Sequence, residues 1–450
     1  MPHTLTITQA AERIRSGRLS PVELLDACFS QIEALDGSLH AWVLVDREGA
    51  GQSARCLQEE LARGRYRGPL HGIPVGIKDI IDVKGMPTAA GARHLYNRVP
   101  DKDAAVVARL RSSGAVIPGK TVTTPFACFD PAETRNPWNP DHTPGGSSSG
   151  SAAAVAARMC PASLGSQTGG SISRPAAYCG LVGLKPTFGR ISLRGILPVS
   201  YELDHPGPFT RSVADAAVML QCLAGRDPLD PLSADVPVDT YRIEPPARAP
   251  RVGVIRTYFP ENAGETMREA TGDAIERLAS AGAEFTDVHL PGSFADLHEN
   301  HALLLAVGAA NVHGERYGAH RDAFPPGLRE IIERGRTTGA VAYARARRHQ
   351  IAFKSEVLAA FENVDLLLTP ATPTPAPSGL TSTGNPAFNS PWSYAGLPTS
   401  VLPAACASDG LPAGIQLVAR PFAESQLLSI SAWCEAHLEW DRAPSILSGD

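Results

Sequence analysis

The sequence predicts an α/β protein, with one large domain built around a mainly parallel sheet. Three observations support this prediction. Helix and strand patterns alternate from one end of the chain to the other. Residues 251–290 show a strand, a helix and a second strand, the pattern of a parallel β-α-β unit. The 450 residues are 43% hydrophobic and 19% charged, so the chain can bury a large core.

The N-terminal segment is expected to be helical. Thr8 or Thr6 can cap a first helix. Ser20 followed by Pro21 is a typical start for a second helix, which extends to about Leu35.

The next part of the chain mixes strands, helices and loops. Residues 68–85 form a strand-rich segment that is broken by glycines, and a helix at 103–113 and a strand at 115–117 follow. Residues 130–150 are rich in Pro, Gly, Asn and Ser, so they are expected to be a loop. A helix of small residues is expected at 151–159.

The second half of the chain continues the alternation. Residues 226–250 are rich in Pro and Asp and form a long surface loop or a boundary. After the β-α-β unit, residues 295–361 are mostly helical, 364–370 form a buried strand, and the last segment alternates strand and helix. No repeat of 20–50 residues is present, which favours one large domain.

Composition excludes several classes of function. The net charge is −5, which argues against a nucleic-acid-binding surface. The eight cysteines form no C-x-x-C pair, and the N-terminus lacks the pattern of a signal peptide. No apolar run is long enough to span a membrane, and no His or Cys cluster has metal-site spacing. We therefore expect a soluble cytoplasmic protein with no metal.

One serine motif is treated as a chance match. Residues 146–150 read G-x-S-x-G, centred on Ser148. In an α/β-hydrolase this motif directly follows a strand. Here the prolines at 137–144 exclude a central strand before it. An α/β-hydrolase would be labelled by serine-reactive probes at Ser148.

A second serine cluster carries more information. Thr168, Gly169 and Gly170 precede Ser171, and two glycines allow tight backbone curvature. Consecutive N–H groups can then converge on one point, as in an oxyanion hole beside a nucleophile. The alternative is an ordinary turn.

A third cluster supplies a candidate base. In I-P-V-G-I-K-D the small Pro74 and Gly76 share a strand face with Lys78 and leave space around it. A buried lysine loses solvation, its pKa falls, and the neutral amine can accept a proton. The alternative is a lysine at a strand end that reaches solvent or pairs with Asp79.

Together these clusters resemble the amidase signature family in order, spacing and surroundings. The resemblance covers nearly the whole chain and is weakest at 225–360. Its main motifs are G-I-P-V-G-I-K-D-I-I-D-V-K-G-M-P-T at 72–88, R-N-P-W-N-P-D-H-T-P-G-G-S-S-S-G-S-A-A-A-V-A at 135–156, G-S-Q-T-G-G-S-I at 165–172, C-G-L-V-G-L-K-P-T-F-G-R at 179–190, G-P-F-T-R-S-V-A-D-A at 207–216 and G-L-P-A-G-I-Q-L-V-A at 410–419.

The resemblance implies the amidase signature fold, a large, mostly parallel or mixed twisted sheet flanked by helices on both faces. Residues 1–450 would form a single domain. The catalytic core would be 60–225, the variable substrate-specificity region 226–360, and the C-terminal completion of the sheet 361–450.

The resemblance also implies a Ser–cis-Ser–Lys triad and an acyl-enzyme mechanism without metal or cofactor. Ser171 would be the nucleophile, Lys78 the base and Ser147 the bridging serine, with a cis peptide bond between Gly146 and Ser147. The oxyanion hole would lie at Gln167, Thr168, Gly169 and Gly170, and Ser148 would contact the substrate.

Two departures from the family pattern suggest a substrate. Gln167 replaces the usual aspartate of G-T-D-T-G-G-S-I-R, and Arg174 lies three residues after the nucleophile. The second feature is similar to the malonamidase branch, in which this arginine holds a substrate carboxylate. A guanidinium binds carboxylate through paired hydrogen bonds. We therefore expect a small amide or ureide with a carboxylate, unless Arg174 belongs to a structural ion pair.

Two other functions stay open. The chain could be the glutaminase-type subunit of a tRNA-dependent amidotransferase, which requires a partner subunit. It could also be a catalytically silent scaffold with the amidase fold, although all three triad positions are present. Family analogy allows a homodimer, and we expect no nucleic-acid or membrane partner.

Overall fold

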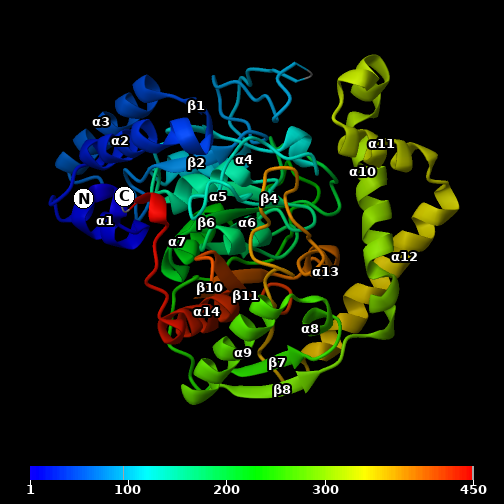
Figure 1. Ribbon diagram of the computed structural model, residues 1–450. Helices are drawn as coiled ribbons and strands as arrows, with labels where there is room; N and C mark the ends of the chain where they lie inside the picture. Colours follow the sequence, from blue (N-terminus) through cyan, green and yellow to red (C-terminus); the bar gives the residue numbers. More distant parts are fainter. Residues whose placement is uncertain (95, 448–450) are drawn as a thin grey trace.

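A sheet of eleven strands runs through the whole molecule in the computed structural model, which describes residues 1–94 and 96–447 (Figure 1). The order of the strands across the sheet is β1-β3-β2-β4-β6-β5-β10-β11-β9-β7-β8. The strands are β1 (Trp42–Val45), β2 (Val75–Lys78), β3 (Gly119–Thr121), β4 (Ala162–Gln167), β5 (Val182–Lys185), β6 (His205–Thr210), β7 (Arg251–Ile255), β8 (Glu284–Val288), β9 (Leu366–Pro370), β10 (Thr399–Cys406) and β11 (Pro412–Val418).

The sheet is mixed. Strand β2 is parallel to both β3 and β4, and β7 is parallel to both β8 and β9. The neighbouring strands from β4 to β9 across the centre are antiparallel. The predicted β-α-β unit is confirmed as β7, α9 and β8.

Helices connect many of the strands along the chain and cover the sheet. The α-helices are α1 (Ile7–Arg15), α2 (Pro21–Leu39), α3 (Arg47–Ala62), α4 (Ala105–Ser112), α5 (Ser149–Ala156), α6 (Ser173–Tyr178), α7 (Val213–Leu223), α8 (Phe259–Asn262), α9 (Glu265–Ser280), α10 (Leu297–His320), α11 (Pro326–Thr337), α12 (Ala340–Glu356), α13 (Ser390–Ala395) and α14 (Glu424–Leu438). Short 3-10 helices occur at Pro2–Thr4, Pro125–Ala127, Gly292–Asp296, Arg321–Ala323, Val357–Phe361 and Ser445–Leu447.

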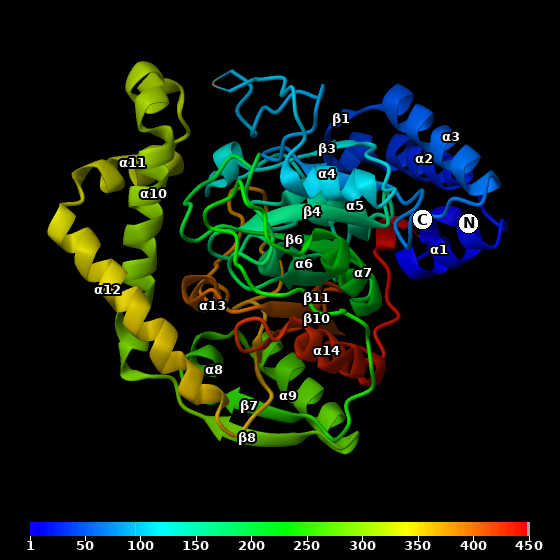
Figure 2. The same ribbon diagram turned by 180° about the vertical axis from the view of Figure 1, so that it is seen from behind.

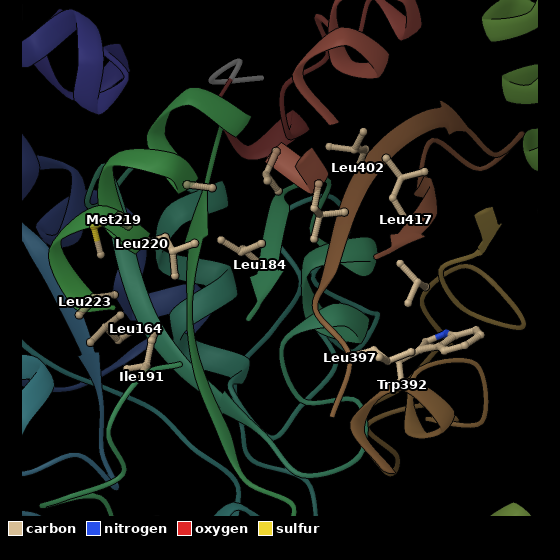
Figure 3. Close-up of a cluster of buried hydrophobic side chains, with 14 of the residues drawn as sticks. Leu164, Leu184, Ile191, Met219, Leu220, Leu223, Trp392, Leu397, Leu402 and Leu417 are labelled. Atoms are coloured by element: carbon tan, nitrogen blue, oxygen red, sulfur yellow. The ribbon is translucent and has the colours of Figure 1, made fainter. Parts of the chain in front are cut away.

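Two large apolar clusters show that both faces of the sheet are covered. Val401 and Leu402 are adjacent in β10 and belong to different clusters. Successive side chains of a strand point to opposite faces, so the two clusters lie on opposite faces at β10. At β9 the successive residues Leu366, Leu367 and Leu368 all belong to the cluster of Leu402, which therefore covers both faces there. Figure 3 shows part of the cluster that contains Leu402, with Leu184 of β5 and Leu417 of β11, the strands on either side of β10, and with Leu220 of α7. This arrangement confirms the predicted fold class.

The helices α10, α11 and α12 form an arm beside the sheet in both views (Figures 1 and 2). Helix α10 packs against both α11 and α12. The predicted helical content of 295–361 is confirmed, and α10 contacts the segment that follows β4.

Most local predictions match the structure, and one strand is shifted. Thr6 caps α1 and Ser20 caps α2, each in a capping box. The strand expected at 115–117 lies instead at 119–121. Strand β6 contains Pro206 and Pro208 although it is central, because β5 pairs only with residues 209 and 210, beyond the two prolines.

Candidate active site

Lys78 ends strand β2 and is fully buried. Its Nζ lies 2.7 Å from the hydroxyl oxygen of Ser147 and 2.9 Å from that of Ser166. Strands β2 and β4 are parallel neighbours, so their carboxyl ends meet at the same edge of the sheet. This topology places the lysine beside the loop that follows β4.

The carboxylate next to Lys78 in the sequence is paired elsewhere. Asp79 accepts a hydrogen bond from the ammonium of Lys120 at 2.8 Å, and both side chains are fully buried. Lys78 therefore has no ion pair with Asp79. Burial lowers the pKa of Lys78 from the usual 10.5 to about 7, against the smaller opposing effects of Asp204 and Cys128. Half of the molecules would thus carry a neutral amine at pH 7.

The loop before α5 presents Ser147 to this lysine. The peptide bond between Gly146 and Ser147 is cis, as the resemblance implies. The backbone N–H of Thr124 donates to the carbonyl of Ser147 at 3.1 Å. A Cβ on Gly146 would lie 2.7 Å from the side chain of Thr383, so this position requires glycine.

In the segment at the end of β4 and after it, the backbone carbonyls are hydrogen-bonded and several N–H groups are not. The four carbonyl groups of residues 167–170 each accept a hydrogen bond. Their donors are His205 Nδ1 at 3.3 Å, His301 Nε2 at 3.2 Å, Ser393 Oγ at 2.8 Å and the N–H of Arg174 at 2.9 Å. Among the described residues, the backbone N–H groups of 168–171 donate to no acceptor. These N–H groups are therefore available to an oxyanion.

Gln167 stabilises this segment with its side chain. Its Oε1 accepts hydrogen bonds from the backbone N–H groups of Ile172 and Ser173, both at 2.8 Å. Its Nε2 donates to Ser393 Oγ at 3.0 Å, and that hydroxyl donates in turn to the carbonyl of Gly169. An aspartate could accept the first two bonds but could not donate the third.

A cavity of about 510 Å³ connects these groups. Ser147, Thr168, Gly169, Gly170 and Ser171 line one wall. Helices α10 and α11 also line the cavity, with apolar side chains and with four polar ones, which are His298, His301, Glu330 and Arg334. The region of weakest family resemblance therefore faces the candidate nucleophile.

The structure places Ser148 away from the cavity. Its side chain is fully buried, and its hydroxyl donates to the carbonyl of Ser166 and accepts from the N–H of that residue. Gly165 allows this close packing, because a Cβ there would lie 2.7 Å from the Ser148 hydroxyl. The Ser148 hydroxyl therefore attaches the loop to β4, and Ser148 is not among the residues that line the cavity.

Arg174 lines the cavity and is only 4% exposed. Its guanidinium donates to the carbonyls of Gly384 and Gly146, both at 2.7 Å, and to the hydroxyl of Thr383. In the described chain its bonds thus go to neutral oxygens, and its Nε has no partner. Burial lowers the pKa of Arg174 to about 10, so the guanidinium stays charged at pH 7.

Sequence reasoning missed two groups near the candidate triad. Asp204 accepts from the hydroxyl of Thr168 at 2.5 Å and from the N–H of Val199 at 2.8 Å. Burial raises its pKa to about 6, against the effect of these hydrogen bonds. His301 comes from α10, more than 130 residues from the loop that it contacts. No local motif signals either residue.

Comparison with known proteins identifies the family. A family model described as Amidase matches residues 23–428. The chain belongs to the amidase family. It is an enzyme of the type that hydrolyses amide C–N bonds.

The similar proteins include both amidotransferase subunits and amidases. The chain is 37% identical to the A subunit of the glutamyl-tRNA(Gln) amidotransferase of Carboxydothermus hydrogenoformans, over 98% of each chain. It is 31% identical, with a TM-score of 0.91, to a protein from a vestigial complex that reveals the evolutionary origins of an s-triazine catabolic enzyme, over 98% of this chain and 100% of that chain. It is also 31% identical to the peptide amidase of Stenotrophomonas maltophilia, with a TM-score of 0.86 and 98% of each chain covered. The similarity supports the amidase family without specifically supporting its malonamidase branch.

The described residues hold neither a membrane-spanning helix nor a metal-binding cluster. No helix in residues 1–94 or 96–447 has the length and hydrophobicity needed to cross a bilayer. Over the same ranges, no group of three or more His, Cys, Asp or Glu side chains could hold a metal ion.

Proposed function

We propose that this amidase cleaves its substrate through an acyl-enzyme on Ser171, with Ser147 as the bridging serine and Lys78 as the base. We further propose that it releases ammonia from a primary amide, as a glutaminase-type subunit does. One observation carries the first proposal: a fully buried lysine without an ion pair to Asp79 lies 2.7 Å from the hydroxyl of Ser147. Ser147 and Ser171 both line the cavity.

The proposed chemistry is a proton relay. Neutral Lys78 accepts the proton of Ser147, and Ser147 accepts the proton of Ser171 as the oxygen of Ser171 attacks the amide carbonyl. The C–N bond breaks as the relay returns a proton to the leaving nitrogen, and ammonia departs. Water then attacks the acyl-enzyme with its proton going to the relay, which releases the acid and restores Ser171.

The oxyanion would be stabilised by the free backbone N–H groups after β4. Thr168, Gly169 and Gly170 lie at the cavity wall together with the nucleophile. Donors that are aimed before the reaction stabilise developing charge without reorganisation, and each is worth about 100- to 1000-fold in rate.

Ammonia release from a panel of primary amides and half-amides tests this mechanism. The Ser171→Ala protein should lose hydrolysis and also lose labelling by a sulfonyl fluoride, while Ser148→Ala should keep both. Full amide hydrolysis by Ser171→Ala would exclude the assignment. Labelling at Ser148 would point instead to an α/β-hydrolase site.

The comparisons favour the glutaminase-type function over a free-standing half-amide hydrolase. Curated relatives that are 36–38% identical over nearly the whole chain are A subunits of glutamyl-tRNA(Gln) amidotransferases. Such a function requires glutaminase activity and a partner subunit. Purification of the full chain from its native cell, followed by mass spectrometry and a glutaminase assay, would test both. A homodimer that lacks any other subunit and acts on other amides would contradict it.

A free-standing hydrolase of carboxylate-bearing amides remains the second candidate, because of Arg174. A buried charged guanidinium that bonds only neutral oxygens can accept a carboxylate from a substrate. If it does, Arg174→Met should lose activity on acidic amides and keep it on neutral amides. If Arg174 only holds the carbonyl of Gly146, both activities should fall together.

We propose that residues 226–360 set the specificity within a single domain of 450 residues. Helices α10 and α11 supply the wall that faces the nucleophile. Exchange of Ile331 for a larger Trp should narrow the cavity. It should then raise KM for bulky amides more than for small ones.

A further inference from the structure

His301 connects the specificity region to the candidate oxyanion hole. It lies on α10, is 7% exposed and lines the cavity. Its Nε2 lies 3.2 Å from the carbonyl oxygen of Thr168. A Cβ on Gly169 would lie 3.5 Å from Cε1 of the same ring, so the imidazole packs along this peptide.

The histidine is held in one orientation and one protonation state. The ring of Tyr394 meets it edge-on, with the centroids 6.1 Å apart. Burial lowers the pKa of His301 to about 4, so the imidazole is neutral at physiological pH. Since a carbonyl can only accept, the proton lies on Nε2, and Nε2–H donates to Thr168.

A hydrogen bond to this carbonyl also fixes an amide N–H. The Thr168–Gly169 peptide is trans, because the Gly146–Ser147 bond is the only cis bond in the described chain. In a planar trans peptide, the C=O and the N–H point in opposite directions. A donor on the Thr168 carbonyl therefore aims the N–H of Gly169 away from His301. That N–H is among those with no acceptor in the described structure.

We propose that His301 is a positioning residue for the oxyanion hole, which acts by fixing the Thr168–Gly169 peptide plane. The inference rests on the proposed acyl-enzyme function. Ser393 acts in the same way on the next peptide, since its hydroxyl donates to the carbonyl of Gly169. Both residues lie outside the loop itself, on α10 and α13. The helix that shapes the substrate wall thus also sets the geometry of catalysis.

Two substitutions separate positioning from packing. His301→Leu keeps most of the ring volume and removes the donor. His301→Gln keeps an N–H that can reach the Thr168 carbonyl. The control is His313→Leu on the same helix, because His313 is also buried but contacts Phe126 rather than the loop.

The readouts are kcat and KM on the best amide of the panel, and the rate at which phenylmethylsulfonyl fluoride labels Ser171. His301→Leu should lower kcat and the labelling rate about 10- to 100-fold with KM nearly unchanged, because an oxyanion hole acts on the transition state. His301→Gln should recover to within about threefold of the parent rate. His313→Leu should leave both rates near the parent values.

Three results would overturn the inference. These are an unchanged kcat in His301→Leu, an equal loss in His301→Gln, or an equal loss in the control. The labelling rate needs no natural substrate, so the inference can be tested even if no amide of the panel is cleaved. Failure of the parent protein to label at Ser171 would instead contradict the proposed function.

Discussion

The protonation of Lys78 should control the pH dependence of this amidase. With a pKa of about 7, half of the molecules carry a neutral Lys78 at pH 7. A lysine with the usual pKa would be neutral in only about one molecule in 3000 at that pH. Since only the neutral amine can accept the proton of Ser147, kcat/KM should fall about tenfold per pH unit below 7 and level off above about pH 8.

A substitution of Asp204 should shift the pH below which kcat/KM falls. Its negative charge favours the protonated form of Lys78 and so raises the pKa of the lysine. Asp204→Asn keeps the acceptor for the N–H groups of Val199 and Ser200 and removes the charge. The acid limb of the pH profile should therefore move to lower pH, by about half a unit to one unit.

The assay is ammonia release between pH 5 and pH 9.5 at constant ionic strength. The difference between the two proteins should be largest between about pH 6 and pH 7, because the carboxyl group of Asp204, with a pKa of about 6, is then charged and Lys78 is still partly protonated. Asp230→Asn is the matched control, because Asp230 is also buried but binds the N–H of Leu193, away from the triad. Two results would refute the reasoning. These are a fall of the parent's kcat/KM that is centred near pH 5, and a shift of this fall to higher pH in Asp204→Asn.

Three further predictions concern stability, measured by urea unfolding. Lys78→Met should be inactive yet more stable than the parent, by at least about 1 kcal/mol at pH 6. Its advantage should shrink as pH rises from 7 to 10.5, because over that range the unfolded parent binds a proton that its folded form does not. An advantage that grows with pH would contradict the burial of Lys78. Lys120→Met should lower the free energy of unfolding by about 3–5 kcal/mol, since it leaves the buried carboxylate of Asp79 without its partner. A loss below about 1 kcal/mol would show that Asp79 is solvated. Gly165→Ala should lower the free energy of unfolding by about 1–3 kcal/mol, because the new Cβ would lie 2.6 Å from the ring of Phe209. The control is Gly272→Ala in α9, which has open space around it and should be neutral or stabilising.

The sequence alone predicts the parts of the molecule that depend on neighbouring residues. The caps at Thr6 and Ser20 and the β-α-β unit follow from local patterns, and the structure contains all of them. The family resemblance adds the cis bond before Ser147, which the structure also contains. These features can be predicted because the residues that determine them are close in the sequence.

Only the tertiary structure decides which side chains meet across the fold. Asp79 could have neutralised its neighbour Lys78, but the parallel pairing of β2 and β3 brings Lys120 to the carboxylate instead. His301 reaches the peptide after Thr168 because α10 packs beside the loop that follows β4. Such contacts depend on strand order and helix packing. A buried charge or carbonyl forms a hydrogen bond with the group that the fold places next to it. The sequence therefore determined the motifs of this amidase, and the packing of distant elements decided how their charges and backbone dipoles are arranged.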